Sequence, residues 1–171
     1  MHFFRHLLPL TLLLALSLPA HAAIPGAGDM APDVLGKTLD GKAVKVSDHA
    51  GKVVVVSFWA TWCAYCLKEL PILEGVQKLG GAANVQVIAV NTEDRDMFRH
   101  VSRELKKMTL KLAYDPDKAG AQAYGVKGIP HLVIIGRDGK IVEVYRGYSE
   151  ASLDGIVASI NLAIATPAPA N

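Results

Sequence analysis

The chain has 171 residues, a length that favours one domain with a short additional segment. Its 18 lysines and arginines are interspersed with 16 aspartates and glutamates, so it has no basic block of the kind that binds nucleic acid or acidic lipid. Because the charges are mixed in this way, we expect no nucleic-acid partner. The two cysteines can form at most one disulfide.

Residues 1–22 have the layout of a secretory signal peptide. Arg5 gives a positive start, residues 7–18 form an apolar run, and Ala20-His21-Ala22 fits the small-x-small cleavage pattern. The run is shorter than the roughly 20 apolar residues that cross a bilayer, and no cysteine directly follows it for a lipoprotein anchor. We expect export to the periplasm, where a disulfide can persist, with an uncleaved membrane anchor as the alternative.

The two ends of the exported chain are predicted to be loose. Residues 23–30 are rich in Gly, Ala and Pro, which indicates a flexible leader before an ordered domain at 31–165. The Pro/Ala-rich residues 166–171 are predicted to form a disordered tail. Near the start of the domain, Asp40-Gly41 precedes the alternating residues 43–46, which predicts an N-terminal β-hairpin.

Predicted strands and helices alternate through the middle of the chain. Residues 53–59 are continuously apolar and largely β-branched, as expected for a central strand buried on both faces. The later elements are a helix at 63–79, a strand at 85–90, a helix at 92–107, a strand at 110–114, a helix at 119–124, strands at 132–135 and 141–146, and a helix at 149–164. The alternation predicts an α/β fold, in which a mixed sheet has helices on both faces.

Cys63 and Cys66 lie where the predicted central strand ends and the next helix begins. A zinc site needs four ligands, and the chain has no second cysteine pair and no histidines at paired spacing. Covalent haem attachment needs a histidine where Leu67 stands. A structural disulfide closing so small a ring would restrain the unfolded chain very little. The remaining interpretation is a redox dithiol.

The position of this pair predicts its chemistry. Free N–H groups at a helix start favour a thiolate and lower a cysteine pKa from about 8.5 to between about 3.5 and 7.5. Cys63 is then the nucleophile that attacks a substrate disulfide, and Cys66 resolves the mixed disulfide. Trp59 and Trp62 would surround the sulfur with an apolar surface for extended substrate chains. No metal or organic cofactor is needed, because the dithiol holds the electrons.

Several motifs are spread over residues 31–165. They are Ser57-Phe58-Trp59-Ala60-Thr61-Trp62-Cys63-x-x-Cys66 with Lys68-Glu69-Leu70-Pro71, Ala31-Pro32-Asp33, Asp40-Gly41-Lys42, Gly51-Lys52-Val53-Val54, Tyr124-Gly125-Val126-x-Gly128-Ile129-Pro130 and Asp138-Gly139-Lys140-Ile141. Together they resemble thioredoxin-fold proteins of the TlpA/ResA-like type. That family consists of exported, often membrane-tethered thiol-disulfide oxidoreductases, commonly reductants, some of which serve cytochrome c maturation. The resemblance implies a thioredoxin-like sheet with a central βα insertion, protein disulfide substrates and a membrane electron donor; we expect a monomer.

The resemblance also implies roles for three further residues. Pro130 matches the family's cis-proline, which faces the cysteine pair across a groove. Ile129 would offer backbone groups to a substrate strand. Glu69 matches a family acid near the active site and could modulate a thiol pKa or shuttle a proton. The alternative for Glu69 is a solvated charge on the helix surface.

Three positions depart from the family pattern. Ser57 stands where thioredoxins proper bury an aspartate, which increases the interest of Glu69 as a proton acceptor. Tyr65 stands where the family usually has proline, which leaves the reduction potential and partner preference open. His131 replaces a small polar residue, and it could tune the thiolate, contact substrate or be a partly exposed strand histidine.

The leading hypothesis is an exported thiol-disulfide oxidoreductase that reduces protein disulfides. A disulfide oxidase or isomerase remains open, since the direction follows from the resemblance and not from the residues. An alternative of another class is a metal carrier in which Cys63 and Cys66, with or without His131, hold Cu(I), because soft thiolates select that ion.

Overall fold

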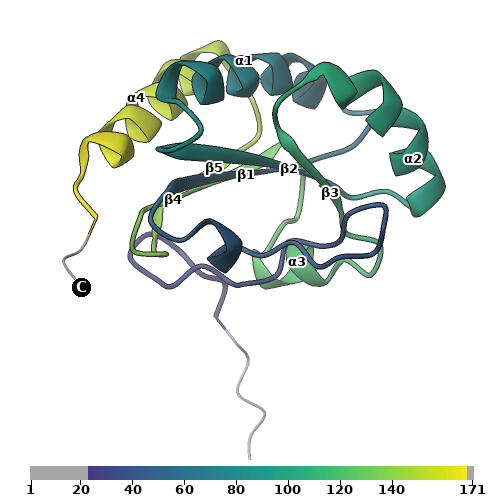
Figure 1. Ribbon diagram of the computed structural model, residues 1–171, viewed down its shortest axis with the longest axis horizontal. Helices are drawn as coiled ribbons and strands as arrows, with labels where there is room; N and C mark the ends of the chain where they lie inside the picture. The colour runs from purple at the N-terminus through teal and green to yellow at the C-terminus, as the bar shows by residue number, and fades with distance from the viewer. Residues whose placement is uncertain (1–22, 169–171) are drawn as a thin grey trace, which may run out of the picture.

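The computed structural model describes residues 23–168 and centres on one five-stranded sheet (Figure 1). The predicted signal peptide at 1–22 and residues 169–171 lie outside this described part. The elements in chain order are η1 Ser47–His49, β1 Val53–Trp59, α1 Ala64–Gly80, β2 Val85–Asn91, α2 Arg95–Glu104, η2 Leu105–Lys107, β3 Lys111–Tyr114, α3 Ala119–Ala123, β4 His131–Ile135, β5 Ile141–Arg146 and α4 Glu150–Ala165.

The sheet is mixed, as predicted, with the strand order β3-β2-β1-β4-β5. β1 pairs in parallel with β2 and β2 with β3, whereas β4 is antiparallel to β1 and β5 is antiparallel to β4. Helices α1, α2 and α4 lie on one side of the sheet and α3 lies on the other (Figure 1). β1 is therefore central and covered on both faces, which explains its unbroken apolar sequence.

Alternate side chains of β1 serve the two cores of the domain. Val53, Val55 and Trp59 join the cluster that includes residues of α1 and α4. Val54, Val56 and Phe58 join the cluster on the α3 side. Because side chains of a strand alternate between the faces, Ser57 points to the same side as Trp59, toward α1.

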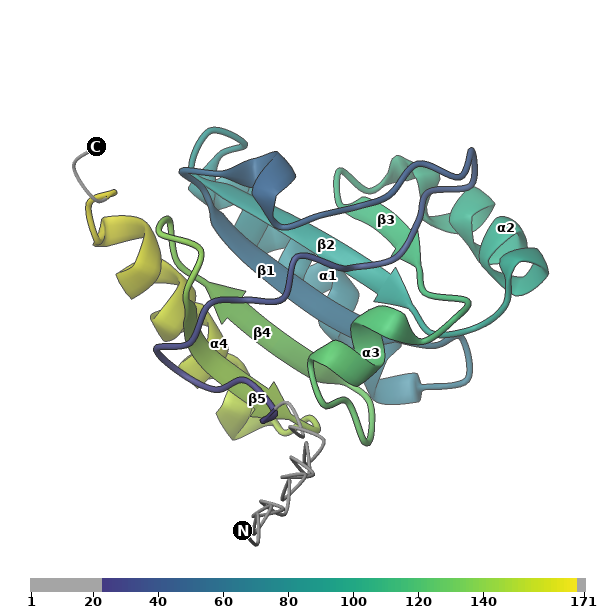
Figure 2. The ribbon, with the colours of Figure 1, turned by 90° about the horizontal axis from the view of Figure 1, so that it is seen from below.

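The predicted N-terminal hairpin around Asp40-Gly41 is short and irregular. Lys37 bridges Ala43 on one side and Tyr114 of β3 on the other, and neither pairing extends into a strand. Gly36 has a φ of +108°, and a side chain there would run into the Tyr114 carbonyl. The two arms are nevertheless joined, since the Val44 N–H donates to the Gly36 carbonyl at 2.9 Å and the Thr38 N–H donates to the Lys42 carbonyl at 2.9 Å. The predicted hairpin is therefore present in a short, irregular form. Figure 2 shows the segment crossing the sheet on the face that carries α3.

The leader at 23–30 is held more firmly than its composition predicts. The Gly28 N–H donates to the Ile141 carbonyl at 2.8 Å, and the Ile141 N–H donates to the Asp29 carbonyl at 2.9 Å. The segment therefore adds backbone pairing at the start of β5. At the other end, Thr166 closes the last turn of α4 with both its N–H and its hydroxyl.

Candidate active site

The two cysteines lie at the start of α1, directly after a short turn that follows β1. Cys63 is the N-cap of the helix, and it forms a disulfide with Cys66 across a Cα–Cα distance of 5.2 Å. Cys63 is 5% exposed and Cys66 is fully buried. A partner can therefore reach only the sulfur of Cys63.

One backbone N–H of α1 points at the Cys63 sulfur. The Cys66 N–H donates to Cys63 Sγ at 3.2 Å, and the Leu67 N–H donates to the Cys63 carbonyl at 3.1 Å. Once the disulfide is reduced, this N–H and the positive end of the helix dipole favour a thiolate on Cys63. The geometry suits Cys63 as the attacking sulfur and Cys66 as the resolving one.

Glu93 fastens the turn that carries Cys63. Its carboxylate accepts the Thr61 N–H at 2.7 Å and the Thr61 hydroxyl at 2.8 Å. The next residue back, Thr92, donates its N–H to the Trp59 carbonyl at 2.9 Å. Because β1 and β2 are parallel neighbours, the loops that follow them meet at one edge of the sheet. Sequence reasoning missed Glu93, whose one signal was an acid just beyond the predicted second strand.

Glu69 lies beneath the helix start and is 1% exposed. The interpretation as a solvated surface charge is therefore wrong. The Ser57 hydroxyl donates to Glu69 Oε1 at 2.7 Å. Burial raises the pKa of Glu69 to about 6, and the hydrogen bond from Ser57 opposes that rise. The serine and the helix glutamate thus form a buried polar pair close to Cys66 in sequence.

Replacing Ser57 with alanine should raise the pKa of Glu69 further. The change removes the one hydrogen bond that this carboxylate accepts among the described side chains. Nothing then offsets the rise in pKa that burial causes. The lost hydrogen bond should also lower the free energy of unfolding by about 1–3 kcal/mol. Carbon-13 NMR of the Glu69 carboxyl follows the titration. Ser47→Ala removes a comparable hydroxyl–carboxylate bond, to Asp33, and should leave Glu69 unchanged; equal Glu69 titrations in both variants would contradict the prediction.

The two tryptophans occupy different environments. Trp62 is 73% exposed beside Cys63, as expected for a residue that meets a substrate chain. Trp59 is fully buried in the same core cluster as both cysteines. The prediction that Trp59 offers surface to a substrate was therefore wrong, because the last residue of β1 still points into the core under α1.

Tyr65, between the cysteines, is exposed and packs against another aromatic ring. Its ring stacks on Tyr148 with a centroid distance of 5.4 Å, and Lys68 Nζ lies 5.8 Å from the Tyr65 centroid. Tyr148 belongs to the loop between β5 and α4. Tyr65, one of the three residues that depart from the family pattern, therefore links the start of α1 to this loop.

The Ile129–Pro130 peptide bond is cis and leads into β4. Phe58 of β1 pairs with His131 of β4, so Pro130, which directly precedes His131, lies beside the end of β1. Ile129 and Trp62 line the same hollow, of about 190 Å³. The turn after β1 and the segment before Pro130 thus form two walls of one groove.

His131, directly after the proline, is 1% exposed. Its ring lies edge-on to Phe58, with centroids 6.1 Å apart. Burial and the nearby charge of Arg146 lower its pKa to about 4, so the imidazole is neutral at pH 7. The interpretation as a partly exposed strand histidine is wrong.

The described residues do not assemble a metal-ligand cluster. Between residues 23 and 168, no group of three or more His, Cys, Asp or Glu side chains is placed to hold a metal ion. Cys63, Cys66 and His131, the set considered for Cu(I), are thus not gathered as a ligand group.

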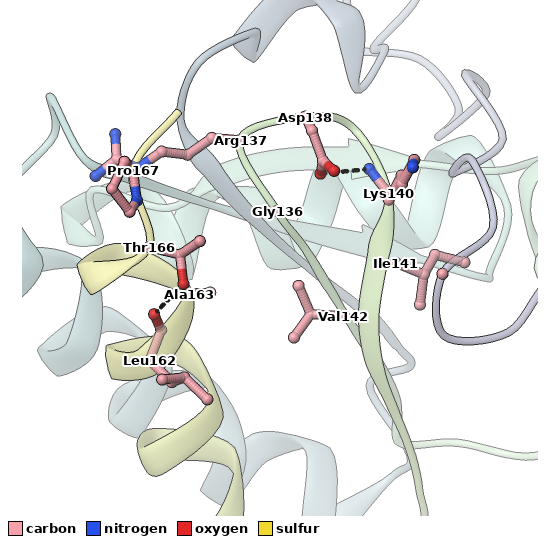
Figure 3. A pocket seen from close by; sticks show the side chains of 11 residues that line it. Gly136, Arg137, Asp138, Lys140, Ile141, Val142, Leu162, Ala163, Thr166 and Pro167 are labelled. Carbon is pink, nitrogen blue, oxygen red and sulfur yellow. Dashed lines mark hydrogen bonds between the residues drawn. The ribbon is translucent and has the colours of Figure 1, made fainter. Parts of the chain in front are cut away.

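A different hollow, of about 420 Å³, lies away from the cysteines, between the β4–β5 turn and the end of α4 (Figure 3). Arg137 at its rim donates to the carbonyls of Gly51, at 2.9 Å, and Ile164, at 3.1 Å. The guanidinium therefore ties the end of α4 to the loop before β1.

Comparison with known proteins identifies the family. The sequence profile described as Redoxin matches residues 26–160, which is more than half of the chain. The chain belongs to the Redoxin family. This Redoxin protein is 32% identical over 122 residues to the thiol-disulfide oxidoreductase ResA of Bacillus thuringiensis subsp. konkukian, covering 70% of this chain and 69% of that protein. It is 30% identical over 126 residues to ResA of Bacillus subtilis, covering 74% and 70%.

Solved structures agree with this placement of the Redoxin protein. A candidate thiol:disulfide interchange protein DsbE from Chlorobium tepidum matches with a TM-score of 0.71 and 32% identity, over 82% of this chain and 99% of that one. The thioredoxin domain of a thiol-disulfide oxidoreductase from Bacteroides vulgatus matches with a TM-score of 0.65 and 27% identity, over 77% and 95%. The fold is thioredoxin-like, and the protein is a thiol-disulfide oxidoreductase.

Proposed function

We propose that this oxidoreductase reduces disulfides in partner proteins, with Cys63 as nucleophile and Cys66 as resolving cysteine. The observation that carries the proposal is the unequal burial of the two cysteines at the start of α1, where Cys63 is 5% exposed and Cys66 is enclosed. An exchange that must begin on one sulfur and end on the other needs this asymmetry. The ResA name of the relatives supports thiol-disulfide chemistry, and the direction is our proposal.

The chemistry proceeds in two thiol-disulfide exchanges. The Cys63 thiolate attacks one sulfur of the partner's disulfide, which breaks that bond, releases a partner thiolate and leaves a mixed disulfide. Cys66 then attacks the Cys63 sulfur and releases the second partner thiolate. Two electrons pass to the partner, and the enzyme ends with the Cys63–Cys66 disulfide that the structure holds.

Glu69 is the proposed proton acceptor for Cys66. A thiol must lose its proton before it attacks, and a sulfur as buried as that of Cys66 is shielded from water. With its pKa raised to about 6, Glu69 is a carboxylate at pH 7 and still binds a proton more readily than an ordinary glutamate does. Its place one turn after Cys66, held by Ser57, fits this role.

The cellular setting is proposed from the sequence. The signal-like pattern at 1–22 supports export to the periplasm, where a reductant must be recharged by a membrane dithiol donor. Service to cytochrome c maturation and a monomeric state belong to the same proposal, which rests on the family resemblance. Within residues 23–168, no helix combines the length and the apolar character needed to cross a bilayer.

The reduction potential of the Cys63–Cys66 pair tests the proposed direction. We expect a value near that of thioredoxin, about −270 mV, when the protein equilibrates with glutathione and its thiols are counted by alkylation. A value near that of DsbA, about −120 mV, would favour the oxidase and contradict the proposal. The double variant Cys63→Ser/Cys66→Ser supplies the alkylation background.

A further inference from the structure

Two neighbouring hollows border the segment that leads into Pro130. The first, of about 190 Å³, is lined by Trp62, Lys118 and Lys127. The second, of about 450 Å³, is lined by Lys127, His131 and Arg146. Residues 127–129 contribute to both. The wall that faces the cysteine turn therefore borders two neighbouring hollows.

The charged side chains around these hollows have one sign. Among the described residues that line them, Lys118, Lys127 and Arg146 are cationic, and no carboxylate is present. None of these three cations takes part in the ion pairs found among the described side chains. The nearby acid, Glu93, lines neither hollow, and its carboxylate is turned to Thr61 and Asn91, from which it accepts three hydrogen bonds.

The second hollow also offers a polar atom in need of a partner. His131 is 1% exposed, and its Nε2 has no hydrogen-bond partner within the described part of the protein. The positive charge of Arg146 acts on this ring, since it contributes to the lowered pKa of His131. A carboxylate entering here would meet a guanidinium and an ammonium group beside a neutral imidazole.

We propose that the groove selects partner segments that carry acidic side chains next to the cysteine that reacts with Cys63. This inference rests on the proposed function and narrows its substrate class. A segment lying extended beside residues 127–129 sends successive side chains to opposite sides. The two residues that flank its cysteine therefore share the side opposite to the cysteine, and their carboxylates would reach the two neighbouring hollows, where they meet Lys118, Lys127 and Arg146.

The attraction should act mainly on the rate of encounter. A cleft lined by charges of one sign raises association rates of oppositely charged partners by about 10–10³-fold. At about 1 M salt the screening length falls to about 3 Å, so the advantage should largely disappear. Selection by charge and its loss in salt are therefore the two signatures to measure.

The test uses three synthetic peptides that contain the same internal disulfide. The residues flanking the reactive cysteine are aspartate, serine or lysine. The enzyme is first reduced with dithiothreitol, which is then removed, and its oxidation by each peptide is followed by stopped-flow tryptophan fluorescence. At low ionic strength we expect the aspartate peptide to react about 10-fold faster than the lysine peptide, and this ratio to approach one in 1 M salt.

Charge variants locate the effect. Lys127→Glu should invert the preference, and Lys127→Gln should reduce it. Lys107→Glu changes an exposed lysine in η2, just before the start of β3 and thus at the opposite end of the parallel strands, and it should keep the wild-type ratio. Equal rates for the charged peptides at low salt, or an unchanged ratio in Lys127→Glu, would overturn the inference.

The serine peptide separates this inference from the proposed function. If the serine peptide oxidises the enzyme and charge has no effect, the charge selection is wrong while disulfide reduction stands. If none of the three peptides oxidises the reduced enzyme, both are wrong.

Discussion

Replacing Cys66 with serine should trap partner proteins on the enzyme and reduce turnover of disulfide substrates to the background rate. Cys63 keeps its place at the start of α1 and can still attack a disulfide. A serine hydroxyl cannot displace the partner from the mixed disulfide, so the covalent complex persists. Non-reducing electrophoresis with mass spectrometry, on cells that express the full chain and are treated with an alkylating agent, identifies the trapped proteins.

The matched control for trapping is Cys63→Ser. It leaves the enclosed sulfur of Cys66 as the sole thiol, and that sulfur is fully buried in the described structure. We expect few or no mixed disulfides from this variant. Equal trapping by both variants, or none by Cys66→Ser, would contradict the assigned order of attack.

Replacing Glu69 with glutamine should slow the resolving step by about 10²-fold or more at pH 7. The amide has nearly the same size and can still accept the Ser57 hydroxyl, but it cannot take a proton from Cys66. In the wild type, the rate of resolution should rise as pH increases through about 6, where Glu69 ionises. Stopped-flow measurement of mixed-disulfide decay from pH 5 to 8 should show that the variant lacks this rise. An unchanged pH profile would contradict the role of Glu69.

The same substitution should change how stability depends on pH. Burial raises the pKa of Glu69 from 4.5 to about 6, so the folded state binds this proton more tightly than the unfolded state does. The wild type therefore loses stability as pH rises from about 4.5 to 6, by about 2 kcal/mol at 1.36 kcal/mol per pKa unit. The glutamine variant lacks this loss, so its unfolding free energy relative to wild type should rise by that amount between pH 4 and 7.

Urea unfolding of the oxidised proteins across this pH range measures the difference. Glu104→Gln removes an exposed carboxyl at the end of α2 and should follow the wild-type pH dependence. Parallel curves for Glu69→Gln and wild type would show that burial does not hold the proton on Glu69.

The regular elements were predictable where one local signal dominated. The β-branched run at 53–59 and the alternating run at 141–146 appear as β1 and β5 with the predicted bounds. The Asp-Gly turn predicted a hairpin near 40–46, but not its irregular form, because Lys37 also pairs with Tyr114 of β3, a strand distant in sequence. The long-range contact that shortens the hairpin has no local sequence signal.

The candidate site was predictable in part. The cysteine pair and Pro130 follow from motifs. The motifs could not show that Trp59 is buried and Trp62 is exposed, because burial of Trp59 depends on β1 being covered on both faces. Glu69 could have been placed in the core, since it lies on the buried face of α1 that also carries Cys66 and Leu73. The role of Glu93 could not have been predicted, because its contact with Thr61 exists only once β1 and β2 are adjacent.

The pairing of Phe58 with His131 bears on which partner disulfides can enter the groove. The walls of the groove are the turn after β1 and the segment before Pro130, and both are anchored on the neighbouring strands β1 and β4, so the sheet limits how far the walls can separate. We expect such a groove to admit one extended chain. A disulfide enclosed in a finished fold could not enter it, so we expect the enzyme to act on a client that is still unfolded or on a disulfide held in an exposed loop.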